Sequence, residues 1–435
     1  MTDPMCTYLQ GLGFPEVQAH EAGYQVTLPP DLSPAIWAMA WHATAGKLRL
    51  VCQGASQATA KEAHTSEIEG LADRILHQAL ALRASDLHFE PSDSQLHVRY
   101  RLDGHLAKQN PVPAGKKDAL TAHLKIRAGM DIAERRRPQD GRLTFIYEGR
   151  AVDMRVSTLP TQYGEKMVLR VLDKVDVQLN LEALGMPAAQ RALLQQAIAK
   201  PYGFVLVTGP TGSGKTTTLY ACLEHIKNDS LNIMTIEDPI EYRLDGINQT
   251  QVKPEIGVDF AAALRTFLRQ DPNVIMVGEI RDKETAELAM RASLTGHLVL
   301  STLHANDACA AIPRLLDMGL PPALLSGSLS LIMAQRLLRR CCRVCSQPSR
   351  ATSPELPAET GCLACAGTGF SGRLGVFEVV PINEAFHQAI QAKTAVGGLR
   401  ELARQQGFPS LETAARERVA LGETTETEML REVMV

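Results

Sequence analysis

A glycine-rich segment at residues 209–216, GPTGSGKT, constrains the possible folds more than any other feature of the chain. It follows an apolar run at residues 204–207 and precedes a predicted helix. Gly209, Gly212 and Gly214 let successive backbone N–H groups point at one anion, and the N-terminus of the following helix adds its partial positive charge. Because strand and helix are both in place, the segment predicts a phosphate-binding loop rather than a chance glycine-rich turn.

The loop also supplies side chains with defined roles toward a nucleoside triphosphate. We expect Lys215 to reach the β- and γ-phosphates of ATP, and the Thr216 hydroxyl to complete the coordination of Mg²⁺. The residues expected to contact the nucleotide are Gly209, Pro210, Thr211, Gly212, Ser213, Gly214, Lys215, Thr216 and Thr217.

A phosphate loop needs an acidic partner at the end of a neighbouring buried strand, to hold the metal or polarise the attacking water. Glu237 and Asp238 follow the apolar run at 233–236, and Glu279 follows the run at 274–277. We expect Glu279 to be the general base, with Glu237 or Asp238 supplementing the metal shell. The alternative for each is a salt-bridged surface carboxylate.

Two histidines flank the strand expected at residues 298–301, because His297 precedes it and His304 follows it. We expect both to lie near the carboxyl edge of the sheet, where α/β proteins bind their ligands. His304 is the better candidate for a γ-phosphate sensor. For His297 a purely structural hydrogen-bonding role is an equal alternative.

The chain is long enough for about three domains. Residues 1–60 are expected to form a small N-terminal domain and residues 62–172 an α+β domain, because an amphipathic helix there precedes alternating strands. Residues 173–185 are a predicted linker. Residues 186–435 are a predicted doubly wound α/β domain with a helical part at 383–435, since its apolar runs suit strands covered on both faces. Those runs are residues 204–207, 233–236, 274–277 and 298–301.

Composition and charge argue against several classes of protein. The 435 residues carry a formal net charge of −3 and no block of like charge, so direct binding to nucleic acid is not expected. No apolar run reaches the roughly 18 residues of a membrane span, and the first residues lack a basic region typical of a secretory signal. We expect a soluble, cytoplasmic protein.

Four of the nine cysteines form two C-x-x-C pairs, Cys342 with Cys345 and Cys362 with Cys365. In a reducing compartment such pairs indicate a metal before a disulfide, and four thiolates can close a tetrahedron around Zn²⁺. The sequence therefore predicts a structural zinc lobe at residues 341–372. The alternatives are a redox pair, an iron–sulfur centre, or Cys341 as a ligand in place of Cys342.

At these motifs the sequence resembles the type II secretion and type IV pilus assembly ATPases of the secretion superfamily. Four signatures coincide in order: the loop at 209–216, an acidic box at 236–241, the segment at 268–282 containing Gly278-Glu279, and a histidine box at 295–304. Upstream, residues 84–91, 139–142 and 155–160 match as well. The resemblance covers residues from about 65 to 435.

The resemblance implies a RecA-like P-loop core preceded by a PAS-like α+β domain, and a homo-hexameric ring at the cytoplasmic face of the inner membrane. It implies that Arg142, Arg155 and Arg170 of the upstream domain act on nucleotide phosphates or at subunit contacts, although Arg155 and Arg170 could equally be salt-bridged strand residues. Partners would be inner-membrane platform proteins. The tetracysteine lobe is typical of assembly motors rather than retraction motors.

The leading hypothesis is thus an ATP-hydrolysing motor that powers assembly of a type IV pilus or a type II secretion pseudopilus. One alternative is a nucleotide-gated scaffold with little turnover. Another is a DNA-uptake or conjugation motor of the same superfamily. The abbreviated N-terminal region departs from longer relatives and leaves the docking partner open.

Overall fold

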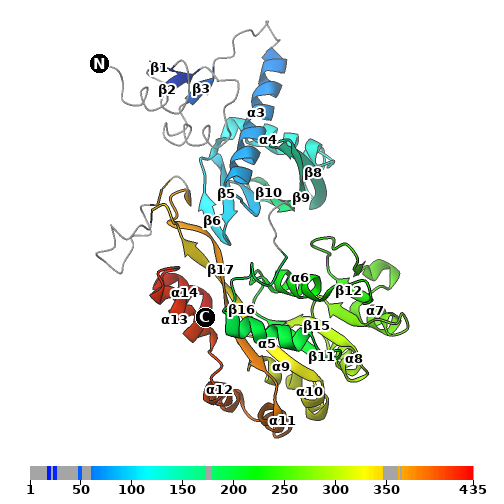
Figure 1. The fold of residues 1–435 in the computed structure, drawn as a ribbon. Helices are drawn as coiled ribbons and strands as arrows, with labels where there is room; N and C mark the ends of the chain where they lie inside the picture. Colours follow the sequence, from blue (N-terminus) through cyan, green and yellow to red (C-terminus); the bar gives the residue numbers. More distant parts are fainter. Residues whose placement is uncertain are drawn as a thin grey trace. The chain divides into compact units, whose positions relative to one another are not determined.

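The computed structural model describes residues 17–20, 23–26, 48–50, 60–172, 179–345, 361–362 and 365–434 (Figure 1). Most of the predicted N-terminal domain and part of the predicted linker lie outside these residues. The described part of the N-terminal region forms a small sheet of β1 (Val17–His20), β2 (Gly23–Val26) and β3 (Leu48–Leu50). The chain divides into two compact units, the first formed by Met1–Val175 with Pro357–Gly369 and the second by Asp176–Leu356 with Phe370–Val435. No helix of the described residues is long and apolar enough to cross a membrane.

The first unit is an α+β fold with a sheet of seven strands, which pair antiparallel in the order β6-β5-β4-β10-β9-β8, with β7 added beside β5. Its elements are α3 (Ala60–Ala81), β4 (Asp86–Pro91), β5 (Gln95–Leu102), β6 (His105–Lys108), β7 (Val112–Pro113), α4 (Ala114–Arg127), β8 (Gln139–Tyr147), β9 (Arg150–Thr161) and β10 (Gly164–Leu172).

One face of this sheet is packed by α3 and α4. Apolar residues alternate along the strands, as Leu143, Phe145 and Tyr147 do on β8, and they form one core with buried residues of α3 and α4. Alternation places the residues between them on the other face. On β8 these alternate residues are exposed and mostly polar.

The second unit contains a mixed sheet with the strand order β13-β12-β14-β15-β11-β16-β17. Its strands are β11 (Gly203–Thr208), β12 (Ile233–Glu237), β13 (Asn248–Gln251), β14 (Val274–Val277), β15 (Leu298–Leu303), β16 (Leu329–Cys341) and β17 (Phe370–Pro381). The four strands expected from apolar runs are all present as β11, β12, β14 and β15, and they pair in parallel. The α/β fold predicted from the sequence is confirmed.

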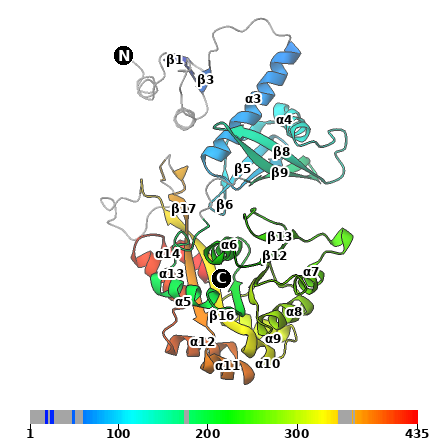
Figure 2. The same ribbon diagram turned by 45° about the vertical axis from the view of Figure 1, so that its right-hand side comes forward.

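Helices cover both faces of this sheet (Figures 1 and 2). On one face, α5 (Ala188–Ile198) and α6 (Lys215–Ile226) share a core with the strands. On the other face the core contains residues of the remaining helices. These are α7 (Phe260–Phe267), α8 (Lys283–Leu294), α9 (Ala311–Asp317), α10 (Pro322–Ser328), α11 (Glu384–Gln391), α12 (Val396–Gln405), α13 (Leu411–Ala420) and α14 (Glu426–Val433), with a short 3₁₀ turn at Pro254–Ile256.

A long hairpin of β16 and β17 extends the sheet beyond the expected strands. Strand β16 runs parallel to β11, and β17 pairs antiparallel with β16 from Leu331 opposite Pro381 to Cys341 opposite Phe370. Both strands are buried along most of their length, so their apolar residues show no strict alternation. The cysteine pairs lie in the connection at the far end of this hairpin.

Candidate nucleotide-binding site

The phosphate loop connects β11 to α6 in a backbone conformation that requires glycine. Gly209, Gly212 and Gly214 have φ angles of +149°, +81° and +87°. A Cβ atom on Gly209 would also lie 2.5 Å from the carbonyl oxygen of Gln335 on β16. The glycines thus satisfy both a conformational and a steric requirement, and they leave the N-terminus of α6 facing the loop.

Lys215 begins α6 and points back over the loop. Its Nζ donates to the carbonyl oxygens of Gly209 at 2.8 Å and Pro210 at 2.9 Å. Burial lowers the pKa of Lys215 to about 8, with a further lowering by Arg336 and an opposing effect of Glu279. Both acceptors are neutral carbonyls, so the buried ammonium would gain from an anion placed in the loop.

One further atom supports a phosphate at this position. The hydroxyl of Ser213 is buried and has no hydrogen-bond partner among the described residues. A buried hydroxyl without a partner is costly, and phosphate oxygens would satisfy it. The loop of this structure therefore fits the triphosphate that its sequence predicts.

The loop opens into a cavity of about 540 Å³ that is lined by most of the predicted site residues. The predicted residues in its wall are Thr211, Gly212, Gly214, Lys215, Thr216, Thr217, Glu237, Asp238, Glu279 and His304. They come from the carboxyl ends of β11, β12, β14 and β15, which are neighbours in the parallel part of the sheet. Parallel strands place such ends on one edge, the usual ligand-binding edge of an open α/β sheet.

Glu279 lies at the centre of a small charged group after β14. Its Oε1 is paired with Arg281, and its Oε2 lies 3.7 Å from His304 Nε2. Arg281 also lies 3.6 Å from the carboxylate of Asp238. The hydrogen bond to Glu279 is the main cause that raises the pKa of Arg281. Arg281 thus links Asp238 after β12 to Glu279 after β14. The sequence pattern did not reveal this role, although Arg281 lies in the segment at 268–282.

Glu237 is the most buried acid of the cavity wall, with 3% of its surface exposed. The alternative of a salt-bridged surface carboxylate therefore does not describe it. Asp238, in contrast, is part of the ion-pair group around Arg281.

The expectation that both histidines lie near the carboxyl edge is right for His304 and wrong for His297. His297 precedes β15, and its carbonyl accepts from Gly203 at the start of β11. Six residues of extended strand, about 20 Å, separate the two ends. The ring Nδ1 of His297 lies 2.9 Å from the carbonyl oxygen of Ala292, a structural contact at the end of α8.

The three predicted arginines form a row across the sheet of the first unit, on the face opposite α3 and α4. Arg142 on β8 is opposite Arg155 on β9, which is opposite Arg170 on β10. They line a cavity of about 590 Å³. Arg170 is paired with Asp86 at 2.9 Å, as one of the alternatives foresaw, whereas neither Arg142 nor Arg155 makes an ion pair within the described residues. Like charges directly opposite one another destabilise a sheet, so an anion bound at this row would reduce the repulsion.

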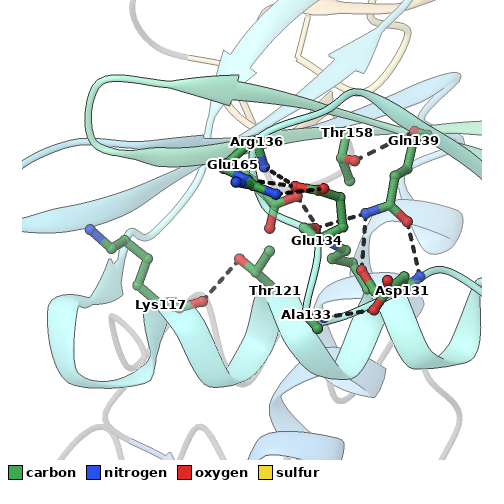
Figure 3. Close-up of polar contacts among 10 residues, drawn as sticks. Lys117, Thr121, Asp131, Ala133, Glu134, Arg136, Gln139, Thr158 and Glu165 are labelled. Carbon is green, nitrogen blue, oxygen red and sulfur yellow. Dashed lines mark hydrogen bonds and ion pairs between the residues drawn. The ribbon is translucent and has the colours of Figure 1, made fainter.

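The strand that carries Arg142 begins at a tightly anchored turn (Figure 3). The side chain of Gln139 donates to the carbonyl oxygens of Asp131 and Glu134, both at 2.9 Å, and accepts from the Asp131 N–H. Lys125 of α4 donates to the same Glu134 carbonyl at 2.7 Å and to the carboxylate of Glu165 at 2.8 Å. Nothing in the sequence pattern pointed to this buried pair, because its partners are 40 residues apart.

The four cysteines of the two C-x-x-C pairs come together at the end of the β16–β17 hairpin. The sulfur atoms of Cys342, Cys345, Cys362 and Cys365 lie within 4.8 Å of one another. Cys341 is not part of this group, and its backbone is instead paired with Phe370 in the hairpin. Four thiolates at such spacing suit a tetrahedral Zn²⁺ site. The arrangement selects Cys342 over Cys341 as the candidate ligand.

Comparison with known proteins agrees with these features. The type II/IV secretion system protein family matches residues 61–433. The chain is 46% identical to the type II secretion system protein E of Aeromonas hydrophila over 83% of this chain and 74% of that protein. It is 44% identical to the type IV pilus assembly ATPase PilB of Myxococcus xanthus, over 85% and 69% of the two chains.

Solved structures show the same fold. The ADP-bound pilus retraction motor PilT is 27% identical and has a TM-score of 0.56, covering 82% of this chain and 96% of that chain. The ATPase DotB of Legionella pneumophila, at 22% identity, has a TM-score of 0.62 over 83% and 94% of the two chains. With its phosphate loop and acidic edge, this chain belongs to the type II/IV secretion system protein family and is an ATPase of that family.

Proposed function

We propose that the chain is the subunit of a homo-hexameric motor that hydrolyses ATP to power assembly of a type IV pilus or a type II secretion pseudopilus. The observation that carries the proposal is the joint presence of Lys215, Thr216 and Glu279 in one cavity at the carboxyl edge of the sheet. The similarity to protein E and to PilB supports the choice of machine.

In the proposed reaction, the loop N–H groups and Lys215 neutralise charge on the β- and γ-phosphates. Thr216 would hold Mg²⁺, which would supply positive charge to offset that of the triphosphate, and Asp238 or Glu237 would supplement its shell. Glu279 accepts the proton of the attacking water. His304 contacts the same carboxylate from the neighbouring strand and is placed to sense the γ-phosphate.

The arginine row of the first unit would act on nucleotide phosphates, in this subunit or in a neighbouring one of the ring. Arg142 and Arg155 are the better candidates because no acidic residue pairs with either among the described residues, whereas Arg170 is already paired with Asp86. Arginine suits this role, since its guanidinium stays charged and donates to phosphate oxygens in a fixed geometry.

The cysteine group would hold a structural Zn²⁺ through Cys342, Cys345, Cys362 and Cys365. Such an ion contributes folding free energy to a lobe with few apolar residues of its own. We place the motor at the cytoplasmic face of the inner membrane, peripherally bound to platform proteins of its machine. The tetracysteine lobe favours assembly over retraction.

A phosphate-release assay on Lys215→Ala tests the proposed active site. We expect multiple turnovers by the wild type and at least a hundredfold lower rate for the variant, because the lysine contacts the transferred phosphoryl group. Size-exclusion chromatography with light scattering would follow the hexamer in both proteins. A variant that hydrolyses ATP at the wild-type rate would contradict the assignment, and a wild type that assembles without turnover would favour a scaffold.

The arginine row allows a matched comparison. Arg155→Ala should lower turnover at least tenfold without loss of thermal stability, since it relieves repulsion from Arg142 and Arg170. Arg170→Ala should lower stability as well, because it leaves the largely buried Asp86 with one guanidinium fewer. Equal stability losses in the two variants, with unchanged turnover, would assign the row a structural role only.

A further inference from the structure

Arg336 of β16 is a buried arginine that no motif of the sequence singled out. Only 6% of its surface is exposed. Its guanidinium donates to three backbone carbonyls, from Nη2 to Asn306 at 2.7 Å, from Nε to Glu432 of α14 at 3.1 Å and from Nη1 to Gln335 at 3.2 Å. All three are neutral acceptors, and no carboxylate pairs with Arg336 in the part of the chain that the structure describes. The carbonyls offset the cost of burying the guanidinium through hydrogen bonds.

One of these carbonyls belongs to residues 304–307, the histidine segment, which directly follows β15 and begins with the candidate γ-phosphate sensor. Two buried side chains hold consecutive residues of this segment. The hydroxyl of Thr208, at the end of β11, accepts from the Ala305 N–H at 2.7 Å. Arg336 donates to the next carbonyl along the chain, that of Asn306. The position of the histidine segment is therefore set from β11 and β16.

Arg336 also lies against the phosphate loop. A Cβ atom on Gly209 would be 3.3 Å from its Nη1 and 2.5 Å from the carbonyl oxygen of Gln335. The side chain of Gln335 accepts from Thr218 of α6 at 2.7 Å, so this part of β16 contacts both the loop and the helix that follows it. The charge of Arg336 contributes to lowering the pKa of Lys215, which shows that it acts within the loop's electrostatic reach.

A second arginine contacts the histidine segment from outside. Arg400 of α12 pairs with Asp307 at 2.5 Å, but 55% of the Arg400 side chain is exposed. Exposed ion pairs contribute little to holding a structure in place. The buried hydrogen bond from Arg336 is therefore the stronger restraint on this segment.

We propose that Arg336 is a positioning residue that fixes the histidine segment, and with it His304, relative to the phosphate loop. This inference rests on the proposed function and deepens it, because His304 lies 3.7 Å from the carboxylate of Glu279. A guanidinium donates in a fixed planar geometry, so it gives the Asn306 carbonyl a defined place beside β16. The bond to Glu432 holds the last helix against the same group.

Steady-state phosphate release by Arg336→Met and His304→Ala, alone and combined, tests the positioning role. Methionine keeps an unbranched apolar stem and removes all the donors. Arg336→Met should lower kcat about tenfold and change KM less than about threefold, because a displaced histidine affects the reacting state rather than nucleotide binding. His304→Ala should lower kcat at least as much.

The double variant separates positioning from an independent effect. In the His304→Ala background, Arg336→Met should lower kcat less than about twofold further, because no histidine remains to be misplaced. Losses that multiply in the double variant would overturn the inference. His304→Ala turning over at the wild-type rate would overturn it as well.

Arg339→Met is the matched control on the same strand. The guanidinium of Arg339 is bonded to Glu428 of α14 rather than to the histidine segment, and its side chain is 16% exposed. The variant removes one partner of a buried ion pair, so it should lose stability. Its kcat should stay within about twofold of the wild type. A tenfold loss of kcat here would assign the effect of Arg336→Met to strand–helix packing and contradict the inference.

Hydrogen exchange measured by mass spectrometry on peptides spanning residues 303–310 does not depend on turnover. The Ala305 N–H donates to Thr208, and the Ala310 N–H donates to Asp307 at 2.7 Å, so both amides report on the histidine segment. Arg336→Met should speed their exchange about tenfold, whereas Arg339→Met should not.

Arg336→Lys keeps a charge but not the planar set of donors, and it carries both tests if Arg336→Met does not fold. Unchanged exchange in the folded variants would refute the inference. Equal phosphate release by the wild type and Lys215→Ala would instead refute the proposed function, and the exchange result would still decide whether Arg336 holds the histidine segment.

Discussion

Glu165→Gln should destabilise the first unit by about 3 kcal/mol, because it removes one partner of a buried ion pair. The side chains of Lys125 and Glu165 are only 1% and 6% exposed, and their charged atoms lie 2.8 Å apart. The variant leaves the Lys125 ammonium buried with the Glu134 carbonyl as its remaining strong acceptor. We take the low end of the usual range, since the glutamine amide oxygen can still accept a hydrogen bond.

Hydrogen exchange measured by mass spectrometry reports on this unit alone, through peptides of β8, β9 and β10. A loss of 3 kcal/mol corresponds to roughly hundredfold faster exchange of their protected amides. The double variant Lys125→Met with Glu165→Leu should return to within about 1 kcal/mol of the wild type, because an apolar pair has no charge to desolvate. Gln139 still donates to the Glu134 carbonyl there.

An exposed ion pair serves as the control for this experiment. Arg136, whose side chain is 89% exposed, pairs with Glu134, so Arg136→Ala should change exchange little. Exchange in Glu165→Gln that is indistinguishable from Arg136→Ala would refute the reasoning. A double variant that loses as much stability as Lys125→Met and Glu165→Leu lose separately, added together, would also refute it.

Three further predictions concern the second unit. Burial and the nearby Asp307 carboxylate raise the pKa of Glu378 from 4.5 to about 7. The folded state then binds an extra proton between these two pH values, so this contribution to stability is full below about pH 4.5 and is lost as the pH rises to 7. Glu378→Gln should therefore raise the melting temperature at about pH 8 but not at about pH 4.5. Elemental analysis should find about one zinc per chain, lost in Cys345→Ser and retained in Cys341→Ser; retention in both would contradict the proposed ligands. Gly209→Ala should abolish nucleotide binding in a fluorescence assay, because its Cβ would meet the Gln335 carbonyl; binding at wild-type affinity would show that the loop is not so constrained.

Apolar runs predicted the parallel core strands well because buried parallel strands are apolar on both faces. The β16–β17 hairpin was not predicted as such. Its apolar residues lack a strict period, and its two strands are separated in sequence by the cysteine segment. The packing of α5 and α6 on one face of the sheet also depends on tertiary contacts that no local pattern records.

The sequence predicted those site residues that have a reactive or charged side chain and directly follow a buried strand. Lys215, Glu279 and His304 each follow a buried strand, and the structure brings them into one cavity. His297 shows the limit of this reasoning, since a residue before a strand lies at the opposite edge. The Lys125–Glu165 pair could not be identified from the sequence, because its partners are 40 residues apart and lie on elements that only the tertiary fold brings together.

Glu279→Gln offers the most direct measurement of the central claim, that this cavity binds and hydrolyses ATP with Glu279 as the base. Equilibrium binding of a fluorescent ATP analogue and single-turnover phosphate release would be measured on the same preparations. We predict near wild-type nucleotide binding with a rate of phosphate release at least a hundredfold lower. Phosphate release by Glu279→Gln at the wild-type rate, with binding intact, would contradict it.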